Sequence, residues 1–141
     1  HTCAIADAKA YCWGSALFGV LGSGSPTSSV PVAVDTSGVL AGKAIVAMGA
    51  TCVIADDGKA YCWGIGTTGA LGNGESQNSN VPVAVDTSGV LAGKTVTTIS
   101  GSTCAIADAK AYCWGSGSYG KLGNGDTQDS SVPVAVSPVQ Q

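Results

Sequence analysis

The chain has 141 residues, of which 45% are hydrophobic and 21 are glycine, so it can bury a core but contains many tight turns. Its net charge is −3, arginine is absent, and the six lysines are scattered along the sequence. Because binding to phosphates requires clustered basic residues, we expect no nucleic-acid partner.

The longest stretch without charged residues, 10–34, is interrupted by glycine and proline and is rich in serine. It therefore does not predict a membrane-spanning segment, and we expect no membrane partner. No charged n-region followed by an apolar segment opens the chain, so any secretion signal would already have been removed.

The chain contains one sequence unit that occurs three times. Residues 11–14 (YCWG) return at 61–64 and at 112–115, with a period of about 50 residues. Such a period is typical of stacked structural modules and argues against a single catalytic pocket. We predict one repeat array over residues 1–141, with repeats at 1–50, 51–102 and 103–141.

The first predicted element of each repeat is a β-hairpin. In the first repeat, a two-residue loop at Asp7-Ala8 places Cys3 directly opposite Cys12, within the distance that a disulfide bridges. The second repeat has a loop of three residues that ends in Gly58, where a positive φ favours glycine, and its cysteines stay opposed. The sequence predicts one disulfide in each repeat, between Cys3 and Cys12, Cys52 and Cys62, and Cys104 and Cys113.

Two alternatives use the same cysteines. A zinc site needs four ligands, whereas each hairpin supplies two thiols and His1 is the only histidine, so we expect no metal. Buried, reduced thiols that act as small hydrophobic side chains would suit an intracellular protein. Disulfides instead predict an oxidising compartment, extracellular or periplasmic.

The hairpin loops contain one unfavourable choice. A two-residue turn of the primed type requires positive φ and favours glycine or asparagine, yet Ala8 and Ala109 stand at this position. We expect these hairpins to be strained or to use another turn type.

Each hairpin is followed by a glycine-rich loop and by a strand at residues 30–34 (VPVAV) or its counterparts. A further strand is predicted at 43–49 and again at 94–100. Four short strands with apolar residues on both faces are typical of a propeller blade, so the predicted fold is all-β with four-stranded blades. The chain holds three hairpins but two strands of the 43–49 type, so one blade is a strand short.

Three motifs of the first repeat resemble the regulator of chromosome condensation repeat: residues 1–5 (HTCAI), 9–14 (KAYCWG) and 19–24 (GVLGSG). The resemblance implies a β-propeller, usually of seven blades, that presents surfaces to other proteins. Members of the family include nucleotide exchange factors for small GTPases and secreted bacterial inhibitors of β-lactamase. This sequence departs from the family by having three repeats, no arginine and one histidine, so no exchange-factor residue can be transferred to it.

Two segments, 64–69 and 115–120, match the dinucleotide fingerprint Gly-x-Gly-x-x-Gly. The fingerprint requires a helix that begins at these glycines, whereas a second turn follows here, so we predict repeat loops and no cofactor. With one histidine and no Gly-x-Ser-x-Gly motif, the chain offers no catalytic residue and is predicted not to be an enzyme. Adjacent Asp56 and Asp57 are assigned to turn formation.

The repeats differ most at pairs of residues in the glycine-rich loops. Variation on a constant frame is where binding specificity can lie, and the aromatic residues among these pairs are candidate anchors for a protein or glycan ligand. The alternative is that Phe18 packs between blades and Tyr119 covers its own loop. The candidate binding residues are Leu17, Phe18, Thr67, Thr68, Ser118 and Tyr119.

These observations predict a non-enzymatic, exported protein-interaction scaffold. Propellers close with about four to eight blades, so three blades leave two open faces. Either the protein continues beyond Gln141 as part of a longer propeller, or another chain supplies the missing blades. Of these we expect self-association, as a dimer that closes a six-bladed ring or as an open filament, while another protein is an alternative partner. The alternative functions are a structural subunit of an extracellular assembly and a secreted binding protein similar to enzyme inhibitors.

Overall fold

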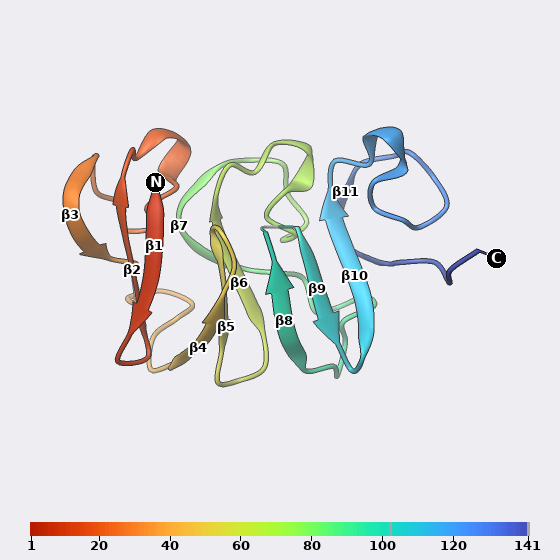
Figure 1. Cartoon of the computed structure of the whole chain (residues 1–141), viewed down its shortest axis with the longest axis horizontal. Coiled ribbons are helices and arrows are strands. Elements are labelled where there is room, and N and C mark those ends of the chain that lie inside the picture. Colours follow the sequence, from red (N-terminus) through yellow and green to blue (C-terminus); the bar gives the residue numbers. More distant parts are fainter. Residues whose placement is uncertain (102, 141) are drawn as a thin grey trace.

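A computed structural model of the chain describes residues 1–101 and 103–140. Within these residues it contains eleven strands and three short 3-10 turns, and the strands form three antiparallel sheets side by side (Figure 1). The strands are β1 (Thr2–Ala6), β2 (Lys9–Gly14), β3 (Ser28–Ala33), β4 (Ile45–Met48), β5 (Cys52–Ala55), β6 (Ala60–Gly64), β7 (Ser79–Ala84), β8 (Val96–Ser100), β9 (Cys104–Ala107), β10 (Lys110–Gly115) and β11 (Ser130–Ala135).

Each sheet is a meander whose strands follow one another in chain order. The first blade contains β1, β2 and β3, the second β4 to β7, and the third β8 to β11. The prediction of an all-β fold with four-stranded blades is confirmed for the second and third blades. The first blade has three strands in the described residues, as the count of strands in the sequence predicts.

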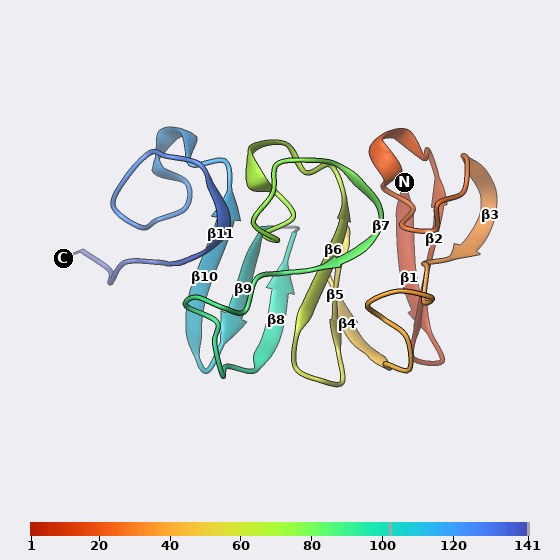
Figure 2. The ribbon, with the colours of Figure 1, turned by 180° about the vertical axis from the view of Figure 1, so that it is seen from behind.

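The blades do not begin where the sequence repeats begin. β4 lies at the end of the first repeat, yet it pairs with β5, so that Ile45 faces Ala55 in the second blade. A tight connection joins β4 to β5, whereas residues 34–44 form a long connection that leaves the first blade and runs along the side of the molecule seen in Figure 2. The first strand of the second blade (β4) and of the third blade (β8) therefore comes from the end of the preceding sequence repeat.

The hydrophobic core lies between the sheets, in one cluster at each of the two junctions. Trp63 and Trp114 are completely buried in these clusters. The indole Nε1 of Trp63 donates to the backbone oxygen of Val20 in the preceding blade, at 2.9 Å, and that of Trp114 donates in the same way to Ala70, at 3.1 Å. Each tryptophan thus fixes its blade to a loop of the blade before it.

A glycine makes room for each tryptophan. A Cβ atom added to Gly22 would lie 2.8 Å from Nε1 of Trp63, and one added to Gly72 would lie 2.9 Å from Nε1 of Trp114. Both glycines also have positive φ. The second glycine of the Gly-x-Leu-Gly-x-Gly loop is therefore required by the junction between blades.

Every blade contains one disulfide, as predicted. The bonds join Cys3 to Cys12, Cys52 to Cys62, and Cys104 to Cys113, and the two Cα atoms of each pair lie 4.1 Å apart. Each pair is directly opposed in the register of its hairpin, which brings the two side chains together.

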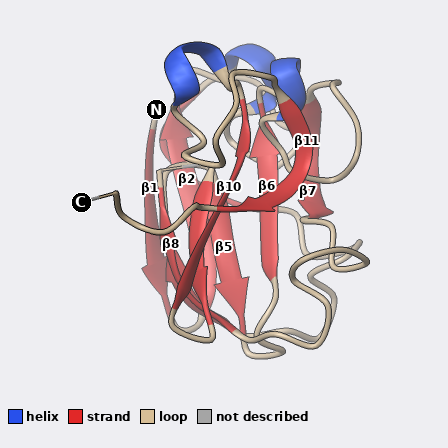
Figure 3. Ribbon diagram, turned by 90° about the vertical axis from the view of Figure 1, so that its right-hand side faces the viewer, coloured by secondary structure: helices blue, strands red, loops and turns tan. Residues whose placement is uncertain are grey.

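The hairpin turns lie at the end of the sheets opposite the 3-10 turns (Figure 3). Both loop residues of the first hairpin have positive φ, 50° at Asp7 and 60° at Ala8, and the third hairpin repeats this conformation at Asp108 and Ala109. The primed turn is therefore kept despite its alanine, and the expected strain is present. In the second hairpin the positive φ of 74° falls on Gly58, as predicted.

Candidate protein-binding loops

A three-residue 3-10 turn follows the second strand of every hairpin. These turns are η1 (Leu17–Gly19), η2 (Thr67–Gly69) and η3 (Ser118–Gly120), and they contain all six residues that the sequence comparison of the repeats selected. They lie in a row along one end of the three blades (Figure 1). The fold therefore brings residues that are about 50 positions apart in sequence to one edge of the molecule.

The middle residue of each turn has the same unusual backbone conformation. Phe18, Thr68 and Tyr119 all have φ of 59°, in the left-handed region that glycine occupies most easily. A β-branched threonine and two aromatic residues are costly there, and such strain is concentrated at functional sites. The conformation is kept in all three repeats, whereas the side chain differs in each.

Two of these strained positions present aromatic side chains to solvent. Phe18 is 59% exposed, its neighbour Leu17 is 69% exposed, and Tyr119 is fully exposed. Phe18 is not buried between blades, and Tyr119 is not covered by its own loop. The arrangement suits side chains that become buried only when a partner binds.

The first two turns are seated firmly on the blade that follows them. A Cβ atom on Gly19 would lie 2.6 Å from Cα of Asn80 on β7, and one on Gly69 would lie 2.4 Å from Cα of Ser131 on β11. The backbone oxygens of Asn80 and Ser131 in turn accept hydrogen bonds from the N–H groups of Gly24 (3.0 Å) and Gly74 (2.8 Å). The backbone of these two turns is therefore fixed against the blade that follows.

Polar side chains brace the second and third turns from below. The N–H of Gly66 donates to Oδ1 of Asn78 at 2.9 Å, and the N–H of Gly117 donates to Oδ1 of Asp129 at 2.8 Å. In both segments that match the dinucleotide fingerprint, the backbone forms a 3-10 turn of three residues and then a further turn. This geometry differs from the long helix whose first amides bind a pyrophosphate.

The adjacent carboxylates of the second hairpin hold its turn. Asp56 accepts a hydrogen bond from the N–H of Ala44, and Asp57 accepts one from the N–H of Lys59 and a second from the hydroxyl of Tyr61. Burial, with the neighbouring carboxylate of Asp57, raises the pKa of Tyr61 above its ordinary value. Among the residues that the structure describes, no group of three or more His, Cys, Asp or Glu side chains could hold a metal ion.

One exposed residue at this edge was missed from sequence. Ile65 is 45% exposed at the base of the second turn, where the other repeats have Ser15 and Ser116. A comparison of the repeats indicates this residue, because position 65 is apolar whereas the two equivalent positions are serine. Ile65 joins the six predicted residues in what we call the loop row.

The sequence matches the regulator of chromosome condensation (RCC1) repeat over residues 57–107 and 108–141. The E3 ubiquitin-protein ligase HERC2 of Homo sapiens is 43% identical over 54 residues, and this match covers 36% of the chain and 1% of HERC2. HERC2 of Mus musculus matches to the same extent.

Two solved structures show the same arrangement of blades. Human WBSCR16 is 26% identical with a TM-score of 0.75, and the match covers 94% of this chain and 36% of that one. Prp20p of Saccharomyces cerevisiae, which was studied for its binding to Gsp1p and histones, is 18% identical with a TM-score of 0.71, over 92% of this chain and 34% of that one. The present chain thus spans about a third of the length of each structure. No helix in the described residues is both long and apolar enough to cross a membrane.

Proposed function

Because this chain belongs to the RCC1 repeat family, we propose that it is a non-enzymatic protein-interaction scaffold that binds its partner through the loop row. The observation that carries the proposal is the exposure of Phe18 and Tyr119 on turns whose strained backbone is the same in all three blades. Aromatic anchors on a rigid frame provide contact area at a low entropic cost. The binding of Prp20p to other proteins supports a role of this class.

We place this activity outside the reducing cytosol. Three disulfides in a chain of this size are typical of proteins from oxidising compartments, and they support an extracellular or periplasmic location. Thiol titration of protein isolated from its natural source tests this location. Free thiols in the native, freshly isolated protein would contradict it.

We also propose that the array is completed by self-association. Apolar faces of sheets are rarely left exposed, and the outer faces of the first and third blades have no covering sheet in the described residues. This proposal concerns the ends of the array, whereas partner binding concerns the loop row.

The binding proposal is tested by changing Phe18 and Tyr119 to alanine together. Because both side chains are exposed, the thermal unfolding midpoint should change little, while capture of the partner from the protein's native medium should be lost. A matched control replaces Val46 by alanine, since this residue is 61% exposed but lies on β4, away from the loop row. Capture that persists in the double variant, or a large fall in its unfolding midpoint, would contradict the proposal.

A further inference from the structure

The two faces of each blade differ in chemistry. The front face, which meets the following blade, carries the disulfide, an isoleucine and small or branched apolar side chains. The rear face, which meets the preceding blade, carries small side chains with a tyrosine and a tryptophan. In the second blade the front face includes Cys52, Ile54, Ala60, Cys62, Leu71 and Val85, and the rear face includes Val53, Ala55, Tyr61 and Trp63.

The two junctions inside the chain join a front face to a rear face by the same contacts. Beside the indole bonds of Trp63 and Trp114, the N–H of Ile45 donates to the oxygen of Ala8 at 2.8 Å, and that of Val96 donates to the oxygen of Gly58 at 2.9 Å. These equivalent contacts in two places define a standard junction between blades of this sequence.

The rear face of the first blade has the side chains of a standard junction but no blade against it. Ala4, Ala6, Tyr11 and Trp13 stand where the third blade has Ala105, Ala107, Tyr112 and Trp114. Ala4 and Ala6 are exposed and Trp13 is half-buried, whereas all four residues of the third blade are buried. In the described part of the chain, the indole N–H of Trp13 has no hydrogen-bond acceptor, unlike those of Trp63 and Trp114.

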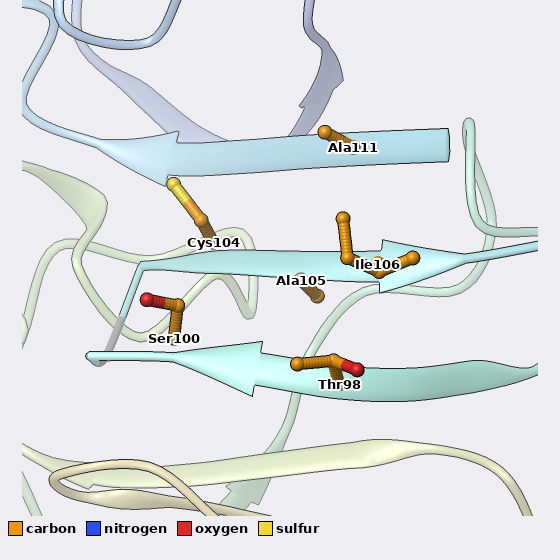
Figure 4. A pocket seen from close by; sticks show the side chains of 6 residues that line it. All are labelled: Thr98, Ser100, Cys104, Ala105, Ile106 and Ala111. Carbon is orange, nitrogen blue, oxygen red and sulfur yellow. The ribbon is translucent and has the colours of Figure 1, made fainter. Parts of the chain in front are cut away.

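The front face of the third blade is the complementary half. Ile106 is 37% exposed, whereas its counterpart Ile54 is 2% exposed beneath the third blade. Figure 4 shows Ile106 and Ala111 of this face beside a hollow of about 60 Å³, whose lining also includes Ala105 of the rear face. The loop that would receive a tryptophan is also present, with Gly123 at positive φ and with Lys121 aligned with the acceptors Val20 and Ala70.

We infer that two copies of this chain associate head to tail, with the rear face of the first blade of one copy on the front face of the third blade of the other. The indole of Trp13 lies over Gly123 of the second copy and donates its N–H to the backbone oxygen of Lys121. This inference rests on the proposed self-association and specifies which faces meet.

Sedimentation velocity of the whole 141-residue chain at micromolar concentration tests the inference with two variants. Ala4→Arg places a charge on the rear face, and Ile106→Arg places one on the front face; both positions are exposed, so each variant should fold. The wild type should associate, and each variant alone should be monomeric. Their equimolar mixture should form a one-to-one complex, because each variant keeps the face that the other has lost.

The other outcomes separate the two proposals. A monomeric wild type overturns both self-association and the head-to-tail arrangement. Association of either variant alone leaves self-association standing but shows that like faces meet, which overturns the present inference.

Val46→Arg, on neither end face, is the control and should associate like the wild type. If Ile106→Arg unfolds, Val136→Arg on the same face replaces it. A discrete dimer or open-ended growth both support head-to-tail contact, as a ring or as a filament.

Discussion

Ala8 and Ala109 show how a single residue can be held in an unfavourable conformation. Both have positive φ in a primed turn, where an L-residue with a side chain is strained by about 1–2 kcal/mol. The opposed cysteines on either side fix the register, so the turn has no freedom to change type.

We expect Ala8→Gly and Ala109→Gly to increase stability by about 0.5–1 kcal/mol each, because relief of strain exceeds the entropy that glycine adds to the unfolded chain. Urea unfolding measures the change. Gly58→Ala is the matched reverse substitution and should destabilise, since φ is 74° and the new Cβ would lie 3.0 Å from Cγ2 of Thr95. A neutral or destabilising Ala8→Gly would refute the assignment of strain.

Tyr61 makes the folding stability of the chain depend on pH. Its folded-state pKa is raised, so the unfolded chain, with an ordinary pKa of about 10, loses the phenol proton first as pH rises. The contribution of Tyr61 to stability is therefore complete below pH ~10 and is lost above it.

Tyr61→Phe should cost about 1–2 kcal/mol at neutral pH, through the lost hydrogen bond to Asp57, and should reduce the fall in stability above pH ~10. Unfolding by urea at a series of pH values measures both effects. Tyr11→Phe provides the control, because in the described residues the hydroxyl of Tyr11 makes no hydrogen bond. Equal alkaline slopes for wild type and Tyr61→Phe would contradict the role of Tyr61.

At the scale of the elements, the loop of one blade and the tryptophan of the next form one unit. The glycine-rich loop contributes a carbonyl oxygen and a flat surface, and the following hairpin contributes the indole. Packing and hydrogen bonding therefore act at the same place, which makes the junction sensitive to a single added methyl group.

Gly72→Ala should destabilise the chain by about 1–3 kcal/mol more than Gly74→Ala. Both glycines have positive φ, so both substitutions carry the backbone penalty, but a Cβ atom on Gly74 meets nothing within 4 Å whereas one on Gly72 meets Trp114. Denaturant unfolding followed by tryptophan fluorescence compares the two variants. Equal losses in both would mean that the junction tolerates the extra methyl group.

The strands and disulfides could be predicted from sequence because local rules determine them. Turn length fixes the opposition of Cys3 and Cys12, and the repeat places every hairpin. The pairing of β4 with β5 was not evident, because a repeat period has no inherent starting point and residues 34–44 give no signal of direction. The candidate loops were found from their variation, but the exposure of Phe18 depends on a positive φ that no residue type at that position predicts.

At the scale of the whole molecule, position in the array determines how accessible each disulfide is. Cys52 and Cys62 are fully buried, because the third blade covers the front face of the second. Cys3 and Cys104 are half-buried, since the first blade has three strands and the third blade has no sheet in front of it. Chemically equivalent bonds therefore differ in exposure.

Mild reduction of the Ala4→Arg variant, which the head-to-tail inference expects to be monomeric, should open Cys104–Cys113 and Cys3–Cys12 before Cys52–Cys62, because the attacking thiolate must reach the sulfur. Timed alkylation followed by peptide mass spectrometry gives the order. Reduction in urea, where the blades are unfolded, is the control and should remove the order. Early reduction of Cys52–Cys62 under native conditions would show that the second junction opens readily.

The first strand of the second blade, β4, directly follows the connection that leaves the first blade, and this arrangement has a mechanical consequence. Tension applied between the two termini reaches the second blade through residues 34–44 and pulls on β4, which is held along its length against β5. The first two blades therefore separate only after a further step in addition to the parting of their apolar faces. Either the connecting segment must first extend to its full length, or β4 must shear away from β5, so the load falls on a ladder of hydrogen bonds as well as on the side chains between the sheets.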